Sequence, residues 1–155
     1  MGDQRAGIPT HALVSAVEAA EGGSTGIAVI LRDRQRNTIY STSYSKEDIT
    51  LEAAAYEAIS EALLTARETG SHTMAVYCDV ASVVGQLNKE EEVPAELLSA
   101  NLQLRALFNR FRNVQVKLAQ SGEYFTAHKL AEGAAKGTSQ KAPVQPSLGL
   151  PGKTP

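Results

Sequence analysis

Short apolar runs separated by polar turns fill the first third of the chain. The runs cover residues 12–18 (ALVSAVE), 26–32 (GIAVILR) and 38–44 (TIYSTSY). A glycine-rich EGGST segment separates the first two runs, and a polar RDRQRN segment separates the second from the third. Short runs rich in β-branched residues and bounded by turn residues are typical of strands. The pattern predicts a three-stranded antiparallel meander.

The pattern then changes to the period of a helix, from Thr50 to about Thr69. Apolar residues recur there at spacings of three and four, Thr50 can cap the start, and Gly70 follows the end. A single long helix is therefore expected after the meander.

Strands and helices alternate over the rest of the body. The pattern predicts a strand at 73–78, a short helix at 81–88, a longer helix at 94–110, a strand at 114–120 and a helix at 126–135. Strand–helix–strand crossovers make parallel neighbours, whereas hairpins make antiparallel ones. The order predicts an α/β fold: a mixed five-stranded sheet, three antiparallel strands then two parallel, with helices on its faces.

The composition is that of an ordinary globular protein, with 43% apolar and 21% charged residues in a chain of 155. This length allows one compact domain. The net charge of −2 argues against a strongly basic protein that coats nucleic acid, although it leaves room for a local basic patch. The single cysteine, Cys78, cannot form an intramolecular disulfide, so a reducing compartment, the cytoplasm, is expected.

The two ends differ from the body. Residues 1–11 have no apolar core of the kind that a secretory signal needs, and no run approaches the roughly 18 apolar residues of a membrane span. Residues 136–155 contain four of the six prolines and no acidic or aromatic residue. We expect a flexible N-terminus (1–11), a folded body (12–135) and a disordered Pro-rich tail (136–155). Presentation of a polyproline segment to a partner is the alternative for the tail.

Asp79 directly follows the apolar strand 73–78. In open α/β sheets, ligands collect at the carboxyl ends of strands near a switch in strand order, so Asp79 is a candidate site residue. The structural alternative is that Asp79 caps the following helix, and one side chain could do both. Cys78 should face the other side of the strand as a buried structural thiol.

Four segments together resemble the ribonuclease H family in its short bacterial, archaeal and reverse-transcriptase-like form. They are GIAVILRD, TLEAAAYEAISEALLTA, VYCDVASVVGQLN and the pair NVQVKL with TAHKLAEGAA. The resemblance covers residues 12–135 and is most specific in VYCDVASVVGQLN and in the Tyr56-Glu57-Ala58 segment. It implies a ribonuclease H-like fold.

The resemblance also implies where a metal site would lie. Family members that cleave the RNA strand of an RNA–DNA hybrid hold two divalent ions, Mg²⁺ or Mn²⁺, with four carboxylates, because two cations stabilise both the attacking and the leaving oxygen. Here Asp79 matches the third carboxylate, and Glu18 is the nearest acidic candidate for the first. Ala55 stands at the second position and His128 at the fourth. The ligand set is therefore incomplete, and the protein is expected to use Mg²⁺ or Mn²⁺, or no cofactor at all.

Two of these positions have alternative interpretations. Glu52 lies one helical turn before Ala55 and could substitute for the missing glutamate. A carboxylate in the first turn of a helix is, however, also favoured by the helix dipole alone. His128 could lie in the pocket or on a helix surface, and an imidazole suits Zn²⁺ or Mn²⁺ better than Mg²⁺.

Basic residues suggest where nucleic acid could bind. In the family, the helical region after the fourth strand contacts the DNA strand, so Arg105 and Arg110 are the candidates by resemblance, although the adjacent KEEEVPAE segment would repel a phosphate backbone. The resemblance favours a non-catalytic pseudoenzyme that binds an RNA–DNA hybrid, another double-stranded nucleic acid or a protein partner. The alternatives are an active metal-dependent hybrid ribonuclease with a rearranged ligand set, and a homodimer formed through a sheet edge. No membrane association is expected.

Overall fold

The computed structural model describes residues 7–20 and 22–137. The strands in this part of the chain are β1 (Pro9–Glu18), β2 (Ser24–Asp33), β3 (Thr38–Glu47), β4 (Thr73–Cys78) and β5 (Asn113–Leu118). The helices are α1 (Leu51–Glu68), α2 (Ala81–Leu87), α3 (Leu98–Phe108) and α4 (Thr126–Ala135), with 3₁₀ turns η1 (Ala95–Leu97) and η2 (Gly122–Phe125). None of these helices is long and apolar enough to cross a membrane.

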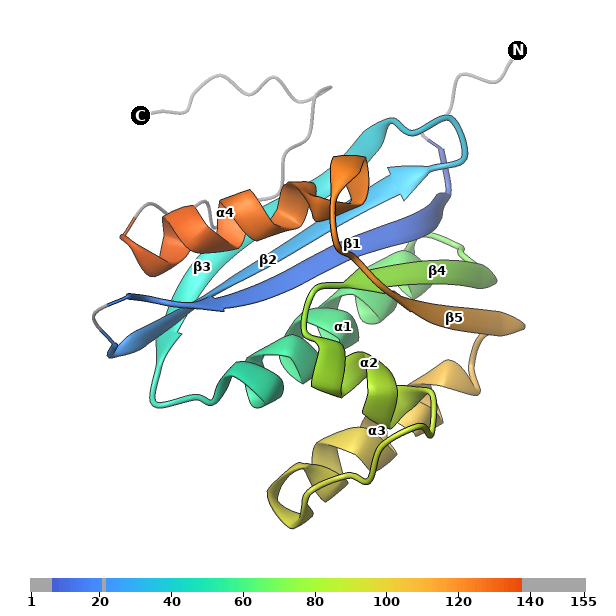
Figure 1. Ribbon diagram of the computed structural model, residues 1–155. Coiled ribbons are helices and arrows are strands. Elements are labelled where there is room, and N and C mark those ends of the chain that lie inside the picture. The colour runs from blue at the N-terminus through green and yellow to red at the C-terminus, as the bar shows by residue number, and fades with distance from the viewer. Residues whose placement is uncertain (1–6, 21, 138–155) are drawn as a thin grey trace.

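The strands form one mixed sheet in the order β3-β2-β1-β4-β5. β2 pairs antiparallel with β1 and β3, whereas β4 pairs parallel with β1 and β5. Figure 1 shows α1 behind the sheet and α4 in front of it, with α2 and α3 below. The predicted fold class is confirmed, and the change from antiparallel to parallel pairing occurs at β1.

Several predicted boundaries differ from the structure by a few residues, and two of the differences change an assignment. β1 begins at Pro9, so residues 9–11 belong to the sheet and not to a flexible N-terminus. The predicted helix at 94–110 is divided into η1 and α3. The predictions for residues 1–6, and for nearly all of the tail (138–155), fall outside the described residues.

The main core lies between α1 and the sheet. The cap predicted at Thr50 is present, because its Oγ1 accepts a hydrogen bond from the Ala53 N–H at 3.1 Å. The buried face of α1 is made largely of alanines, and Ala55 among them is fully buried. Small side chains allow the helix to pack closely on β1 and β2, and burial of their apolar surface stabilises the contact.

A second, smaller core lies between α4 and the opposite side of the sheet. The two layers approach so closely at Gly26 of β2 that a Cβ there would lie 1.8 Å from the carbonyl oxygen of Ala131. Only a residue without a side chain fits at this point. This close contact fixes α4 against the sheet and thereby sets the position of His128 on its first turn.

Candidate functional site

Asp79 follows the last residue of β4 and lies on the α4 side of the sheet. Its side chain is only 7% exposed. The Ser15 hydroxyl donates a hydrogen bond to Asp79 Oδ2 at 2.6 Å, and the backbone N–H of Ala16 donates to Oδ1 at 3.4 Å. Both carboxylate oxygens therefore have donors from β1, the neighbouring strand.

His128 of α4 contacts the same carboxylate, with 2.8 Å between His128 Nδ1 and Asp79 Oδ2. An ionised carboxylate can only accept, so Nδ1 carries the proton in this bond. The Phe125 ring stacks on the imidazole, with centroids 4.3 Å apart and planes inclined by 14°. We call Ser15, Asp79 and His128 the Asp79 centre, and the structure confirms that the predicted residues Asp79 and His128 lie together.

The residue of β1 that faces Asp79 is Ser15 and not Glu18. Val14 is paired with Cys78 in the parallel register, which places the next residue, Ser15, beside Asp79. Side chains alternate along a strand, so Glu18, three residues further on, points to the opposite side of the sheet. Glu18 is also exposed at the end of β1. The structure therefore does not bring Glu18, the acidic candidate for the first ligand position, beside Asp79.

Asp79 does not cap α2, in contrast to the structural alternative. The cap residue of α2 is Val80, and no side chain accepts a hydrogen bond from the first turn. The carboxylate of Asp79 is directed to Ser15 and His128 instead. Cys78 points to the other side of the strand, as predicted, and is fully buried in the main core. Its burial raises the pKa of the thiol to about 12.

The two candidate positions on α1 differ in surroundings. Ala55 is buried in the main core and offers no ligand atom. Glu52 contacts α2: its Oε2 accepts hydrogen bonds from Ser82 Oγ at 2.5 Å and from Gln86 Nε2 at 3.3 Å. These contacts give Glu52 a structural role that joins the start of α1 to α2.

A chain of hydrogen bonds continues from Gln86 to α3. The Tyr56 hydroxyl donates to Gln86 Oε1 at 2.9 Å and accepts from Asn101 Nδ2 at 2.9 Å. Arg105 donates to Asn101 Oδ1 at 2.8 Å and to the Gln86 carbonyl at 3.1 Å. The Arg105 guanidinium is therefore engaged within the fold, whereas Arg110, the other predicted phosphate contact, is exposed.

A family model described as reverse transcriptase-like matches residues 15–134, from Ser15 of the Asp79 centre to α4. The chain belongs to this reverse transcriptase-like family. Its fold is that of ribonuclease H domains, so the resemblance noted in the sequence is confirmed. A comparison with curated proteins finds no match.

Solved structures similar to the reverse transcriptase-like domain share its fold at low sequence identity. The N-terminal RNase H domain of rv2228c from Mycobacterium tuberculosis is 20% identical, with a TM-score of 0.74 over 81% of this chain and 92% of that one. RNase H1 from the halophilic archaeon Halobacterium salinarum is 18% identical, with a TM-score of 0.72 over 83% and 98%. LC11-RNase H1 in complex with an RNA/DNA hybrid is 20% identical, with a TM-score of 0.68 over 81% and 96%.

The Asp79 centre of the reverse transcriptase-like domain does not fit a pair of divalent cations. It supplies one carboxylate, one hydroxyl and one imidazole whose nearer nitrogen is protonated. Hard cations such as Mg²⁺ prefer oxygen ligands, and each is usually held by one or two carboxylates together with water and substrate phosphates, so a pair of ions needs more than the one carboxylate present. Among residues 7–20 and 22–137, no three His, Cys, Asp or Glu side chains are grouped closely enough to hold a metal ion.

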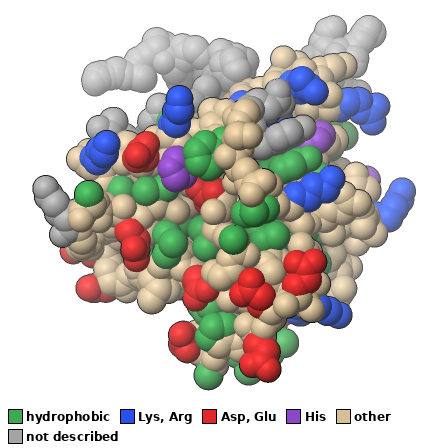
Figure 2. Space-filling view, viewed as in Figure 1, with side chains coloured by type: hydrophobic (Ala, Val, Ile, Leu, Met, Phe, Trp, Pro, Cys, Tyr) green, Lys and Arg blue, Asp and Glu red, His purple; other side chains and the backbone are tan. Residues whose placement is uncertain are grey.

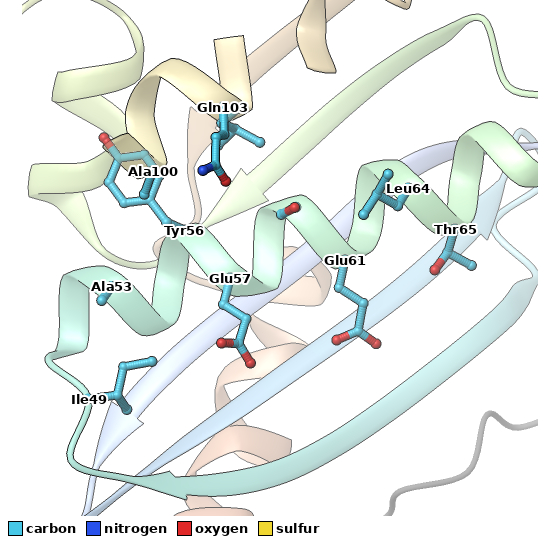
Figure 3. Close-up of a pocket in the computed structure, with 11 residues that line it drawn as sticks. Ile49, Ala53, Tyr56, Glu57, Glu61, Leu64, Thr65, Ala100 and Gln103 are labelled. Carbon is cyan, nitrogen blue, oxygen red and sulfur yellow. The ribbon is translucent and has the colours of Figure 1, made fainter. Parts of the chain in front are cut away.

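A surface groove of about 620 Å³ lies away from this centre, along α1 and α3. Figure 3 shows the carboxylates of Glu57 and Glu61 projecting from α1 on one side of it. Tyr44 donates hydrogen bonds to both carboxylates, at 2.8 and 3.2 Å, and Tyr40 donates to Glu61 at 2.7 Å. Burial is the main cause that raises the pKa of Tyr44, and the hydrogen bond with Glu57 raises it further. Tyr44 therefore remains a neutral donor. The acidic wall makes this groove unsuitable for phosphate.

Charge is unevenly spread over the domain. Figure 2 shows acidic side chains gathered over the half of the molecule where α2 and α3 lie, whereas most basic side chains on this face lie on the half with α4 and the strands. Glu90, Glu91 and Glu92, between α2 and η1, are exposed. A polyanion would therefore be repelled by the α2–α3 region and attracted to the opposite half.

Proposed function

We propose that this reverse transcriptase-like domain binds nucleic acid, an RNA–DNA hybrid or another duplex, and does not cleave it by a two-metal mechanism. The proposal rests on the hydrogen bonds that the Asp79 carboxylate already accepts. Its carboxylate accepts hydrogen bonds from Ser15, Ala16 and His128. A metal ion at Asp79 would have to displace these donors from a nearly buried group.

The balance between the charge of two metal ions and the charge of the available ligands supports the same conclusion. Two divalent ions a few ångströms apart bring four positive charges, which several anionic ligands must offset. Asp79 is the one carboxylate of the Asp79 centre, and Glu52 is engaged by Ser82 and Gln86. Binding of the pair of ions would be weak for lack of negative charge.

Family membership supports the nucleic-acid part of the proposal. LC11-RNase H1, which has the same fold, was solved in complex with an RNA/DNA hybrid. Sequence-independent binding of nucleic acid rests mainly on contacts between cationic side chains and phosphates. Such contacts need no metal centre, so binding can persist where the ligand set is incomplete.

An active nuclease with a rearranged ligand set is the alternative function. Its ligands would be Glu18, Glu52, Asp79 and His128. Glu18 would have to reach around the end of β1 to the other side of the sheet, and Glu52 would have to release two donors of α2. Both changes break hydrogen bonds or require backbone movement. Assembly of this ligand set therefore costs free energy that binding of nucleic acid without metal does not.

Calorimetric titration with Mn²⁺, combined with gel-shift assays at low salt, tests the proposal. We expect no saturable Mn²⁺ binding at millimolar ion and a retarded complex with a labelled hybrid or duplex. Two equivalents of tightly bound Mn²⁺ that disappear in Asp79→Asn would overturn the non-catalytic assignment. Failure to retard any hybrid, duplex or single strand would overturn the nucleic-acid assignment and leave a protein partner or homodimer.

A further inference from the structure

One side of the sheet is left open beyond α4. Met74, Val76, Cys78, Val114 and Val116 point into the main core, so the alternate side chains of β4 and β5 point to the α4 side. Figure 1 shows α4 lying across β1, β2 and β3 and not across β4 and β5. We call this region the open sheet face; its residues are His11 of β1, Thr73, Ala75 and Tyr77 of β4, and Asn113, Gln115 and Lys117 of β5.

The chemistry of the open sheet face is polar, aromatic and cationic. Thr73, Asn113, Gln115 and Lys117 are exposed, and Tyr77 is half-buried. The face carries no carboxylate along β5 or along β4 until Asp79, which is already hydrogen-bonded by Ser15 and His128. Within residues 73–78 and 113–118, this strand pair offers hydrogen bonds and positive charge to a ligand and contains no acidic residue.

Three neighbouring side chains, one from each of the three strands, lie in a row across this face. The rings of His11 and Tyr77 are nearly parallel, inclined by 14° with centroids 6.3 Å apart. The Lys117 ammonium lies 5.9 Å from the centroid of the Tyr77 ring. Parallel rings on a sheet surface, next to a cation, are the arrangement on which nucleic-acid bases stack while a neighbouring phosphate is neutralised.

Two further cations border the open sheet face near the start of β5. Arg110 and Arg112 are exposed there, and the backbone N–H of Arg112 donates to the carbonyl of His72, just before β4, at 2.7 Å, which holds the two segments together. The exposed acidic residues at 90–92 are attached to α2, on the other side of the sheet. Charge complementarity therefore selects a polyanion as the occupant of this face.

We infer that the open sheet face binds a single-stranded segment of nucleic acid, with a base stacked on the His11–Tyr77 pair and phosphates contacted by Lys117 and the bordering arginines. The inference rests on the proposed function and adds to it a surface that is separate from the Asp79 centre. Single strands are favoured over duplexes because the bases of a duplex are already stacked on one another and cannot cover an aromatic ring.

Fluorescence anisotropy with a labelled single-stranded oligonucleotide tests the inference, at several salt concentrations. Tyr77→Leu keeps the apolar surface and removes the π-system, and we expect it to weaken binding roughly tenfold. Lys117→Gln should reduce the slope of log K against log salt by about 0.7, the value for one phosphate contact on a single strand. Lys129→Gln removes another exposed charge, from α4, and serves as the matched control, which should bind as the parent does.

The outcomes separate the two proposals. If Tyr77→Leu and Lys117→Gln lose no more affinity than Lys129→Gln, or if the parent binds hybrid and ignores single strands, the open sheet face is not the site, and the proposed function stands. If the parent binds no nucleic acid, both proposals are wrong. Urea denaturation of each variant shows whether the fold is intact, and a cross-link from a 4-thiouridine oligonucleotide to the peptide that contains Tyr77 supports the inference independently of any variant.

Discussion

Tyr77 and Asp79 lie two residues apart on the same side of the sheet, yet their surroundings differ completely. Asp79 is nearly buried, and three donors satisfy its two oxygens. Tyr77 is half-buried in an open face and lies beside the His11 ring and the Lys117 ammonium. A carboxylate whose hydrogen bonds are all made within the protein stabilises the fold, whereas a surface of exposed polar and cationic side chains can receive a ligand. Under the two proposals, one end of β4 no longer supports metal-dependent cleavage, whereas the surface next to it binds nucleic acid.

The largest effect should come from removing Asp79 itself. Asp79→Ala leaves the fully buried Ser15 hydroxyl, the Ala16 N–H and His128 without an acceptor. We expect the free energy of unfolding to fall by about 3 kcal/mol, measured by urea denaturation.

Asp79→Asn is the matched control for this loss, because it keeps the shape and one acceptor oxygen. It should lose clearly less stability than the alanine variant, and neither should change affinity for nucleic acid. Equal binding losses in both variants would show that Asp79 contacts the ligand and that the contrast with the open sheet face is wrong.

Introducing carboxylates at positions 15 and 128 should enable the Asp79 centre to bind metal ions. In Ser15→Asp/His128→Asp, three carboxylates face one another and repel, so the variant should be less stable than the parent without metal. Mn²⁺ at a hundredfold excess over its dissociation constant should then raise the free energy of unfolding by about 2.7 kcal/mol. Thermal unfolding with and without Mn²⁺ measures the gain, and Ser15→Asn/His128→Asn, of similar shape without the charge, should gain nothing.

The two arginines predicted to bind phosphate should differ in role: Arg105 should stabilise the fold, and Arg110 should act at the surface. Arg105→Ala breaks bonds to Asn101 and to the Gln86 carbonyl and should cost about 1 to 2 kcal/mol of stability. Arg110→Ala should leave stability within about 0.5 kcal/mol and lower the salt dependence of nucleic-acid binding. Denaturation and anisotropy on the same two variants test this assignment, which the reverse pattern would contradict.

The smallest effect concerns Cys78, on the opposite side of β4 from Tyr77 and Asp79. Burial raises the pKa of its thiol from 9.0 to about 12, so the folded state holds the proton more tightly than the unfolded state. The resulting stability is complete below pH 9 and is lost as the pH rises towards 12. Between pH 9 and 10, the parent should therefore lose stability faster than Cys78→Ala, as measured by urea denaturation. Identical slopes would show that the thiol is accessible to water.

Periodicity and family resemblance predict the fold because they depend on many residues at once. The three strands of the meander, the helix capped by Thr50 and the mixed sheet all follow from recurring apolar spacings that no single substitution disturbs. The same spacings place Asp79 at the end of β4 and Cys78 on its buried side.

The details of the site depend on single residues and are harder to predict. Glu18 is the nearest acidic candidate on β1, whereas the structure has Ser15 beside Asp79. Strand alternation is the signal that separates the two residues, because Glu18 shares a side with the buried Val14 and Ala16. The sequence also contains a signal that Arg105 is bonded within the fold, because Asn101 lies four residues before it on the same helical face. The pairing of Gln86 with Tyr56 needs the packing of three helices and has no local signal.

Cleavage and binding measured together on one RNA–DNA hybrid test the central claim most directly. The protein is incubated with a hybrid labelled on its RNA strand in low salt and Mn²⁺, and each sample is divided between a native gel and a denaturing gel. We predict a retarded complex whose RNA remains full-length. RNA that is cut by the parent and left intact by Asp79→Asn would contradict the claim, because it would show that Asp79 still supports metal-dependent catalysis.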